Sequence, residues 1–381
     1  MQIIADENIP YVREAFGTLG RVSVMPGRRI NAKKVRDADI LLVRSVTKVD
    51  EALLAGSRVR FVGTATIGTD HIDEAYLDSE KIGFAAAPGS NATSVAEYVT
   101  AALLVLAREC NRPLKGTSIG IVGVGNVGSR VEKRCRALGM KVLLNDPPLK
   151  RETGAKKFVP IERIFTADIV TIHTPLTYEG PDATYQMVNE DFVAQLKAGS
   201  ILINTARGQI AETRALKRAL DGDQLREVVI DVWENEPNPD DGLVERAAIA
   251  TAHIAGYALD GKVRGTEMIY RAACKFLGKR AVWKKEAVLA EPPVPVFEAN
   301  ATDRSDEDVI REAVLTVCDI EGDDQRMRRT LRQPAEKRGA FFDRLRKNYP
   351  VRREFHNTTI VLKRSRPALR NTLKRLEFEV K

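Results

Sequence analysis

Residues 117–147 read TSIGIVGVGNVGSRVEKRCRALGMKVLLNDP, and this stretch decides the fold. A short apolar run leads into a glycine cluster at 123–128, and a helical pattern follows that ends at Gly139. A second apolar run then ends at Asp146. The order strand, glycine-rich turn, helix, strand and acid is typical of a dinucleotide-binding βαβ unit.

Each glycine of this turn has a chemical reason. Gly123 permits the tight turn, Gly125 lets backbone N–H groups approach a pyrophosphate, and Gly128 allows the helix to pack close to the strand. The start of the helix presents unpaired N–H groups and the positive end of its dipole to the anion. The predicted cofactor contacts here are Gly123, Gly125, Asn126, Val127 and Gly128.

Asp146 predicts which dinucleotide binds. Its carboxylate can accept hydrogen bonds from both ribose hydroxyls of an adenosine and would repel a 2′-phosphate, so we expect NAD rather than NADP. An ordinary glycine-rich turn is the alternative interpretation. The strand and helix on either side, and the acid at the expected distance, favour the cofactor site.

Length and composition limit the class of protein. A chain of 381 residues suits two or three domains, and no apolar stretch approaches the length of a membrane span. We expect no signal peptide, no membrane partner and a cytoplasmic location. The four cysteines are isolated, which is typical of reduced cysteines, and the four histidines show no metal-ligand spacing, so we expect no metal.

The net charge of +8 is unevenly distributed. Residues 326–381 carry 18 Lys and Arg against five Asp and Glu, so the remainder of the chain is net acidic. Such a segment is usually a solvated surface, but it could also bind nucleic acid or supply a positive field for a small anion. No zinc-finger, RNP-like or recognition-helix pattern accompanies the charge, so we do not expect a nucleic-acid partner.

The first 88 residues resemble a small α/β unit. Short apolar runs at 2–5, 22–24, 40–43 and 61–63 alternate with helical patterns, which predicts a parallel sheet. Polar loops at 44–47 and 64–66 follow two of these runs, at the strand ends where α/β sheets bind ligands. Arg44, Ser45 and Thr66 suit an anionic, hydroxylated ligand, although generic loop polarity explains the spacing equally well.

A long helix is predicted over 89–110, where Ser94 and Glu97 form a capping box ahead of apolar residues. Further strands are expected at 169–172, 200–204, 228–232 and 249–253, and polar groups follow several of them. A helix over 256–277 then leads back toward the first unit, and residues 291–295 form a probable linker.

Three of these polar groups form the set that oxidation of a hydroxy acid requires. His253 can take the hydroxyl proton, Glu236 can orient and stabilise the charged imidazole, and Arg207 presents a planar fork of donors to a carboxylate. Singly, each residue is more often a solvated histidine, a loop acid or a surface charge. Together, and behind a dinucleotide turn, they favour a catalytic site. His173 also ends a strand, and we interpret it as structural.

The motifs HTPL at 173–176, NTARG at 204–208, DVWENEP at 231–237 and AHIAGY at 252–257 resemble the D-2-hydroxyacid dehydrogenase family. The resemblance implies an α/β fold with a Rossmann-type NAD domain (91–255) inserted in a flavodoxin-like substrate domain (1–90 and 256–285). It implies Arg207, Glu236 and His253 as the catalytic trio. It also places Thr174, Asp231 and Gly256 near NAD.

The stretches VRSVTKV at 43–49 and GTATIGTDHID at 63–73 resemble one branch of this family, which acts on a phosphorylated four-carbon acid. That resemblance implies substrate contacts from Ser45, Thr66 and Tyr257, and a small C-terminal α+β domain (286–381) that forms a homodimer. Basic residues of this domain could lend charge to the phosphate, across the dimer or within one chain. The candidates are Arg346, Lys347, Arg352 and Arg353.

Two alternatives remain open. The chain could be a dehydrogenase for another D-2-hydroxy acid, such as glycerate or phosphoglycerate, or an NAD-sensing regulatory protein built on the same fold. The complete set of Arg207, Glu236 and His253 favours an enzyme.

Overall fold

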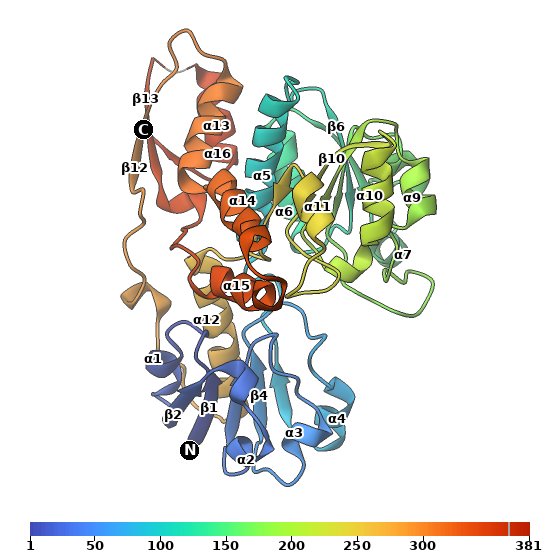
Figure 1. Ribbon diagram of the computed structural model, residues 1–381. Helices are drawn as coiled ribbons and strands as arrows, with labels where there is room; N and C mark the ends of the chain where they lie inside the picture. Colours follow the sequence, from blue (N-terminus) through green and yellow to red (C-terminus); the bar gives the residue numbers. More distant parts are fainter. Residues whose placement is uncertain (365) are drawn as a thin grey trace. The chain divides into compact units, whose positions relative to one another are not determined.

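The computed structural model describes residues 1–364 and 366–381, and the chain divides into two compact units. Unit 1 comprises Met1–Asn91 and Ala258–Glu291, and unit 2 comprises Ala92–Tyr257 and Pro292–Lys381 (Figure 1). Among the described residues, no helix combines the length and the apolar character that a membrane crossing requires.

Unit 1 is built on a five-stranded parallel sheet of order β2-β1-β3-β4-β5, which is the flavodoxin-like order. Its strands are β1 (Gln2–Asp6), β2 (Arg21–Met25), β3 (Ile40–Val43), β4 (Phe61–Thr64) and β5 (Gly83–Ala85). Its helices are α1 (Val12–Phe16), α2 (Ala32–Val35), α3 (Glu51–Leu54), α4 (Glu74–Ser79) and α12 (Leu259–Phe276). Strand β5 lies outside the strands predicted from the sequence.

The central strands of unit 1 are apolar on both faces. Every residue of β3 and β4 is buried, as expected for parallel strands with helices on either side. Helix α12 returns from the far part of the chain and packs here, with the rings of Tyr270 and Phe16 edge to face at 5.6 Å between centroids. The predicted helix over 256–277 therefore exists and completes unit 1.

Unit 2 contains a six-stranded parallel sheet of order β11-β10-β9-β8-β6-β7. Its strands are β6 (Ser118–Val122), β7 (Lys141–Asn145), β8 (Ile169–Ile172), β9 (Ser200–Asn204), β10 (Leu225–Ile230) and β11 (Ile249–Ala250). A single parallel bridge between Leu144 and Phe158 extends the sheet beyond β7. From β6 the chain continues to β7 on one side and then to β8 on the other, so the strand order reverses between β6 and β8, as in a Rossmann sheet. Such a switch point is where α/β sheets bind ligands.

Helices cover both faces of this sheet, and two clusters of buried apolar side chains lie between the layers. They are α5 (Ala92–Glu109), α6 (Gly128–Ala137), α7 (Pro147–Thr153), α8 (Ile161–Ile164), α9 (Glu190–Gln195), α10 (Thr213–Asp221) and α11 (Asp241–Arg246). The carboxyl ends of all six strands lie at the same edge of the sheet, because every strand pairing in it is parallel.

The C-terminal part of unit 2 forms a second, three-stranded parallel sheet of order β12-β13-β14. Its elements are β12 (Val296–Asn300), α13 (Asp306–Val317), α14 (Ile320–Arg328), α15 (Ala335–Lys347), β13 (Thr359–Lys363), α16 (Pro367–Arg375) and β14 (Glu379–Val380). Its buried residues, including Ile310 and Leu373, join the same core cluster as those of α5. Its service as a dimerisation domain stays a prediction.

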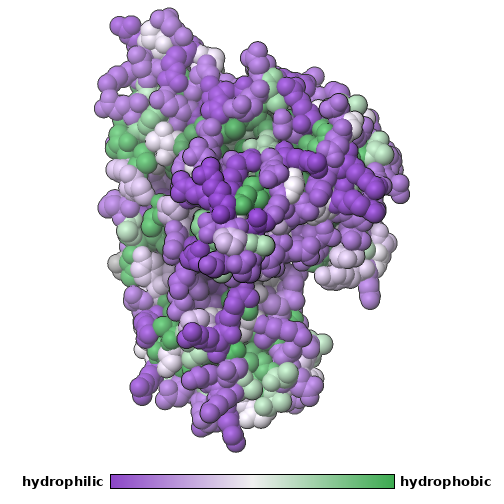
Figure 2. Space-filling model, viewed as in Figure 1, coloured by the Kyte–Doolittle hydropathy of each residue, from purple (hydrophilic) through white to green (hydrophobic). Residues whose placement is uncertain are grey.

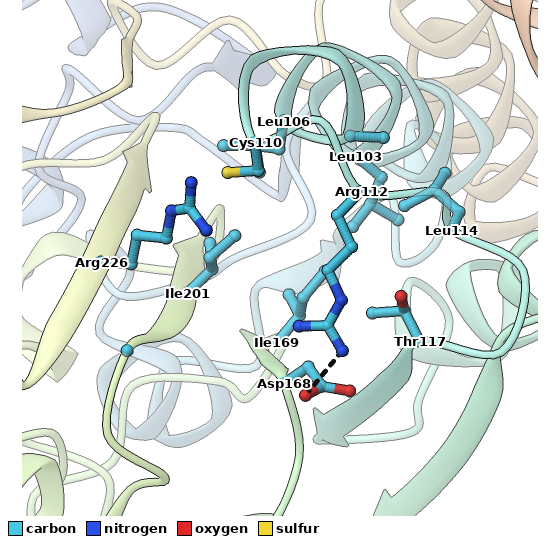
Figure 3. A pocket seen from close by; sticks show the side chains of 12 residues that line it. Leu103, Leu106, Cys110, Arg112, Leu114, Thr117, Asp168, Ile169, Ile201 and Arg226 are labelled. Atoms are coloured by element: carbon cyan, nitrogen blue, oxygen red, sulfur yellow. Dashed lines mark ion pairs between the residues drawn. The ribbon is translucent and has the colours of Figure 1, made fainter.

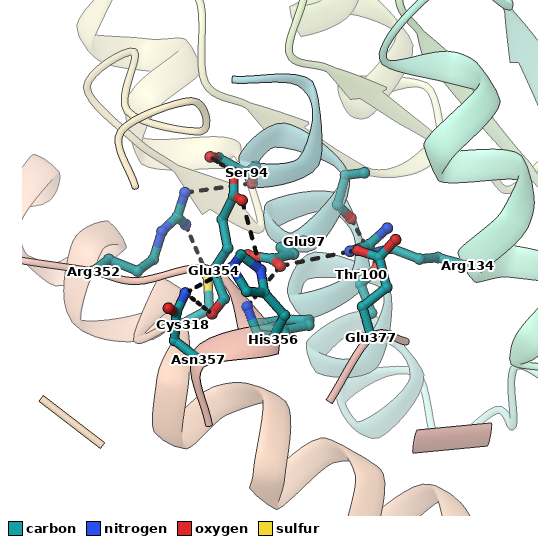
Figure 4. Close-up of polar contacts among 12 residues, drawn as sticks. Ser94, Glu97, Thr100, Arg134, Cys318, Arg352, Glu354, His356, Asn357 and Glu377 are labelled. Carbon is teal, nitrogen blue, oxygen red and sulfur yellow. Dashed lines mark hydrogen bonds and ion pairs between the residues drawn. The ribbon is translucent and has the colours of Figure 1, made fainter. Parts of the chain in front are cut away.

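The predicted capping box at Ser94 and Glu97 is wrong. Helix α5 already begins at Ala92, so both residues lie inside it and are fully buried. Ser94 Oγ donates to Glu354 Oε1 at 2.9 Å, and Glu97 Oε1 accepts the Phe355 N–H at 2.8 Å (Figure 4). Their partners come from the C-terminal segment, more than 250 residues away.

Arg134 of α6 completes this buried network. Its guanidinium is 2% exposed and lies 3.5 Å from Glu97 and 2.6 Å from Glu377, which lies two residues before β14 (Figure 4). Burial raises the pKa of Glu97 to about 8, while Arg134 opposes this shift. Arg134 therefore joins α5, α6 and the end of the chain through one buried carboxyl group, Glu97, and one half-exposed carboxyl group, Glu377.

We expect the substitution Arg134→Met to destabilise unit 2 by about 3–5 kcal/mol, because it leaves the buried carboxyl group of Glu97 without the guanidinium beside it. The chain has two tryptophans, Trp233 in unit 2 and Trp283 in unit 1. Urea unfolding followed by fluorescence in a Trp283→Phe background therefore reports on unit 2 alone.

The matched control is Arg136→Met on the same helix. Arg136 is 48% exposed and pairs with Glu132 one turn earlier, an arrangement that contributes roughly 0.5 kcal/mol or less. Equal effects of the two substitutions would contradict the importance of the buried network.

The large apolar side chains that are exposed on the surface are scattered. The face shown in Figure 2 is largely hydrophilic, with small apolar areas between charged ones. Tyr178 and Tyr185 are two exposed aromatic residues that contact each other, with ring centroids 5.1 Å apart. Isolated exposed apolar residues are normal on proteins and indicate no binding site by themselves.

Candidate active site

The glycine-rich turn links β6 to α6 at the switch point of the unit 2 sheet. Gly123 has φ 86°, and a Cβ atom there would lie 2.7 Å from the backbone of His173 in the loop after β8. A Cβ atom at Gly128 would lie 2.0 Å from the carbonyl oxygen of Gly123. At Gly125 a Cβ atom would meet no atom within 4 Å. Two glycines are thus required by packing, and the third borders open space.

Asp146 follows β7 and organises the same turn. One carboxylate oxygen accepts the Val124 N–H at 2.8 Å, and the other accepts the Leu149 N–H at 3.0 Å and caps α7. A carboxylate has about four acceptor positions, so the side chain can still accept ribose hydroxyls.

The loop after β8 brings Thr174 to the turn. Its hydroxyl oxygen is buried and has no hydrogen-bond partner in the protein, which is unusual for a buried polar atom. The neighbouring His173 contacts Thr171 Oγ1 at 2.9 Å through Nε2, and burial lowers its pKa to about 3. His173 is therefore neutral and tied to its own strand, in agreement with the structural interpretation.

His253 and Glu236 form a hydrogen-bonded pair after β11 and β10. His253 Nδ1 lies 2.8 Å and 3.1 Å from the two carboxylate oxygens of Glu236, which also accepts the Trp233 N–H at 3.0 Å. Burial, the largest influence, would raise the pKa of Glu236, but His253, Arg346 and the Trp233 N–H together lower it. The carboxylate is therefore ionised at neutral pH, so His253 Nδ1–H donates and Nε2 remains for a substrate.

Asp231 holds the loop that carries His253. Its carboxylate is 1% exposed and accepts the N–H groups of Ile254 and Ala255 and the Thr251 hydroxyl, at 2.6–2.9 Å. These bonds fix His253 in a left-handed backbone conformation, with φ 55°. Asp231 thus positions the loop that carries His253, and its predicted contact with NAD stays a prediction.

Arg207 follows β9, the strand beside β10. The next residue, Gly208, packs so closely on the β10 loop that a Cβ atom there would lie 1.9 Å from the backbone of Trp233. The Arg207 loop and the Glu236 loop therefore touch through backbone atoms, and both lie at the edge that carries His253. The structure brings the predicted trio to three adjacent strand ends.

Gly256 and Tyr257 end the loop that carries His253. The Tyr257 hydroxyl accepts a hydrogen bond from Arg346 Nε of α15 at 3.1 Å, and the guanidinium lies 5.8 Å from the ring centroid. The sequence offered Arg346 only as one of four basic candidates. Contacts between residues so far apart leave no local signal that would have selected it.

Ser45 and Thr66 belong to unit 1. Ser45 is exposed in the loop after β3, and Thr66 follows β4, the neighbouring strand. The Thr66 hydroxyl lies 2.7 Å from that of Thr64 and donates to the Gly68 carbonyl. Both residues stand at carboxyl ends of adjacent parallel strands, and their contact with substrate stays a prediction.

Comparison with known proteins places these features in a family. A family model described as D-isomer specific 2-hydroxyacid dehydrogenase, NAD binding domain, matches residues 95–255, and a domain of unknown function matches residues 291–376. A relative from Marinobacter nauticus named erythronate-4-phosphate dehydrogenase is 44% identical over 385 residues, 100% of both chains. One of the same name from Salinibacter ruber is 46% identical over 367 residues, 94% of both.

This chain belongs to the erythronate-4-phosphate dehydrogenase family. The crystal structure of NAD⁺-bound 3-phosphoglycerate dehydrogenase from Entamoeba histolytica is also similar, with 26% identity and a TM-score of 0.62 over 73% of this chain and 95% of that one. These findings confirm the predicted D-2-hydroxyacid dehydrogenase fold and NAD as the cofactor.

The residues of this dehydrogenase fit NAD. The open space at Gly125 leaves room for a pyrophosphate, the buried Thr174 hydroxyl lacks a partner, and Asp146 keeps acceptor capacity beside the turn. No group of three or more His, Cys, Asp or Glu within residues 1–364 and 366–381 is placed to hold a metal ion.

We expect Asp146→Asn to weaken discrimination against NADP, since it removes the charge that repels a 2′-phosphate but keeps an oxygen that can cap α7. The ratio of kcat/KM for NAD over NADP should fall about tenfold or more, which corresponds to roughly 1.4 kcal/mol. Asp73→Asn makes the same change at the N-cap of α4 and should leave the ratio unchanged. An unchanged ratio in Asp146→Asn would show that another group reads the ribose.

A small cavity of about 40 Å³ lies elsewhere in unit 2 (Figure 3). Its lining includes Thr117, Asp168 and Gly199, which directly precede β6, β8 and β9, together with Cys110 and Arg226. It therefore opens at the amino ends of the strands, away from the loops that carry Arg207, Glu236 and His253. It has room for a few water molecules only and is not the active site.

Proposed function

We propose that this protein oxidises 4-phospho-D-erythronate to (R)-3-hydroxy-2-oxo-4-phosphooxybutanoate with NAD, in pyridoxal phosphate (vitamin B6) biosynthesis. The observation that carries the proposal is the His253–Glu236 pair beside Arg207, in a chain that matches relatives named erythronate-4-phosphate dehydrogenase over its full length. Stretches such as VRSVTKV and GTATIGTDHID, which resemble the same enzyme, support it.

The residues suit each step that the protein must perform. Arg207 can hold the substrate carboxylate through its planar fork and polarise the neighbouring hydroxyl oxygen. His253 Nε2 can take the hydroxyl proton, and the ionised Glu236 stabilises the resulting imidazolium. NAD, when bound, accepts the hydride. Asp231 keeps His253 oriented by fixing the backbone on its C-terminal side.

A substrate panel tests the proposal. With NAD present, kcat/KM should be highest for 4-phospho-D-erythronate and lower for D-erythronate, D-glycerate and 3-phosphoglycerate. A preference for either three-carbon acid would favour the alternative dehydrogenase. NAD binding without turnover of any acid would favour a regulatory protein.

We further propose that the enzyme acts as a homodimer in the cytoplasm, with residues 286–381 at the interface. All four cysteines are unpaired and three are buried, which suits a reducing compartment. Light scattering coupled to size exclusion, on the full chain and at several concentrations, should give twice the 42.2 kDa mass of one chain.

A further inference from the structure

Helix α15 packs directly against the loop that carries Glu236. A Cβ atom at Gly339 would lie 2.6 Å from Asn238 Oδ1 and 3.3 Å from Pro237 Cγ, so the helix backbone touches this loop. Phe342, one turn later, is fully buried. Helix α15 lies within the domain of unknown function at 291–376, and Figure 1 shows it beside the yellow segment of the loop.

Arg346 lies on the same face of α15, because residues seven apart in a helix are nearly in line. Its Nε donates to the Tyr257 hydroxyl, and its guanidinium is close enough to Glu236 to lower the pKa of that carboxyl. The helix thus places one guanidinium next to the catalytic loop of the same chain.

This guanidinium makes few direct polar contacts with the part of the chain that the structure describes. Among the described residues, no carboxylate forms an ion pair with Arg346, and the Tyr257 bond uses only one of its five N–H donors. The nearby Glu236 is occupied by His253 and the Trp233 N–H. Arg346 is half-buried. Burial would lower its pKa, but Tyr257, Glu236 and Asp343 together raise it, so the guanidinium stays charged and its planar fork of donors suits an anion.

Two of the other three basic candidates are buried and have structural contacts, and the third is exposed. Arg352 is 5% exposed and donates to the carbonyl oxygens of Ala255 and Ser94 and to Cys318 Sγ. Arg353 is 6% exposed and donates to Asn357 Oδ1. Lys347 is exposed. The hypothesis that any of the four binds the phosphate therefore narrows to Arg346.

We propose that Arg346, together with the Tyr257 hydroxyl, binds the phosphate group of the substrate, so that the domain of unknown function contributes a substrate-binding residue to the active site of its own chain. This inference rests on the proposed function. It leaves Arg207 for the carboxylate and separates the two anionic ends of the substrate between two guanidinium groups. It also makes Arg346 a residue that selects phosphorylated over unphosphorylated acids.

The test compares Arg346→Met with wild type on 4-phospho-D-erythronate and D-erythronate. Loss of a charged hydrogen-bonding group should raise KM for the phosphorylated acid about 10- to 100-fold, while KM for D-erythronate and the affinity for NAD change less than about threefold. Inorganic phosphate should inhibit wild type competitively and Arg346→Met at least about tenfold more weakly. Arg346→Lys keeps the charge without the fork and should recover part of the loss.

The matched control is Arg344→Met, which removes the same charge from an exposed position on the same helix. It should behave as wild type, which excludes a general effect of net charge. An equal loss for both acids in Arg346→Met and Arg346→Lys would overturn the proposal and assign Arg346 to positioning Tyr257 and Glu236. Unchanged phosphate inhibition would overturn it too.

These outcomes differ from failure of the proposed function. If wild type does not oxidise 4-phospho-D-erythronate, the proposed function fails, whatever the variants do. Titration calorimetry with inorganic phosphate on the NAD-bound protein then tests the anion site without turnover: binding lost in Arg346→Met but kept in Arg344→Met supports the site, and equal binding overturns it.

Discussion

Replacement of His253 by alanine is expected to lower kcat by about 10²- to 10⁴-fold, the usual contribution of a positioned general base. Glu236 holds the imidazole through Nδ1, and the Asp231 carboxylate fixes the backbone that follows His253 by accepting the Ile254 N–H. NAD affinity should stay within about twofold, because the glycine-rich turn lies after a different strand. Steady-state kinetics and NADH fluorescence titration measure the two quantities.

His356→Ala is the matched control for this prediction. His356 is also near a glutamate, with Nδ1 3.8 Å from Glu354 Oε2, but it is 49% exposed and far along the chain from the catalytic loops. Its loss should change kcat less than about twofold. A His253→Ala enzyme with near-normal turnover would remove the histidine from the reaction and leave the oxidation without a base.

The glycine-rich turn and the placement of Arg207, Glu236 and His253 at strand ends could be predicted because their signals are local. Gly123 and Gly128 are required by backbone contacts that any dinucleotide turn makes, and the strand ends follow from short apolar runs. Parallel pairing then brings distant loops to one edge, which is why Arg207, Glu236 and His253 meet.

The roles of buried polar groups could not be predicted in this way. Ser94 and Glu97 have the spacing of a capping box, yet their partners Glu354 and Phe355 lie about 260 residues away. Likewise Arg352 belongs to a basic segment but is buried against the carbonyl oxygen of Ala255. Such contacts depend on how α5 and the C-terminal segment pack, and residue spacing along the chain carries no information about that packing.

The basic C-terminal segment is a second case in which the sequence alone could not identify the residue concerned. Its charge excess predicted an anion-binding role, but only the packing of Gly339 on the Pro237 loop, and with it the contact of Arg346 with Tyr257, distinguishes one basic side chain from the others. The same helix also holds Arg344, which is exposed, two residues before Arg346. The charge count suggested an anion-binding role for the segment, and the geometry of α15 is the reason why we propose Arg346 for it.

Glu236→Gln is expected to lower kcat on the order of 10³-fold, because the neutral amide loses the charge that stabilises an imidazolium and can hold the wrong tautomer of His253. NAD affinity should again stay within about twofold. Glu234→Gln is the control, since Glu234 lies in the same loop and accepts the Thr213 N–H instead of contacting His253.

The dependence of this loss on pH follows from the lowered pKa of Glu236. A carboxyl whose pKa falls on folding contributes its charge above its usual value of 4.5 and loses it only as the pH falls through the lowered value. The difference between wild type and Glu236→Gln should therefore persist at pH 6–9 and shrink only in acid. A variant that matches wild type at pH 8 would show that His253 works without a carboxylate partner, and the Nδ1 hydrogen bond would then be structural.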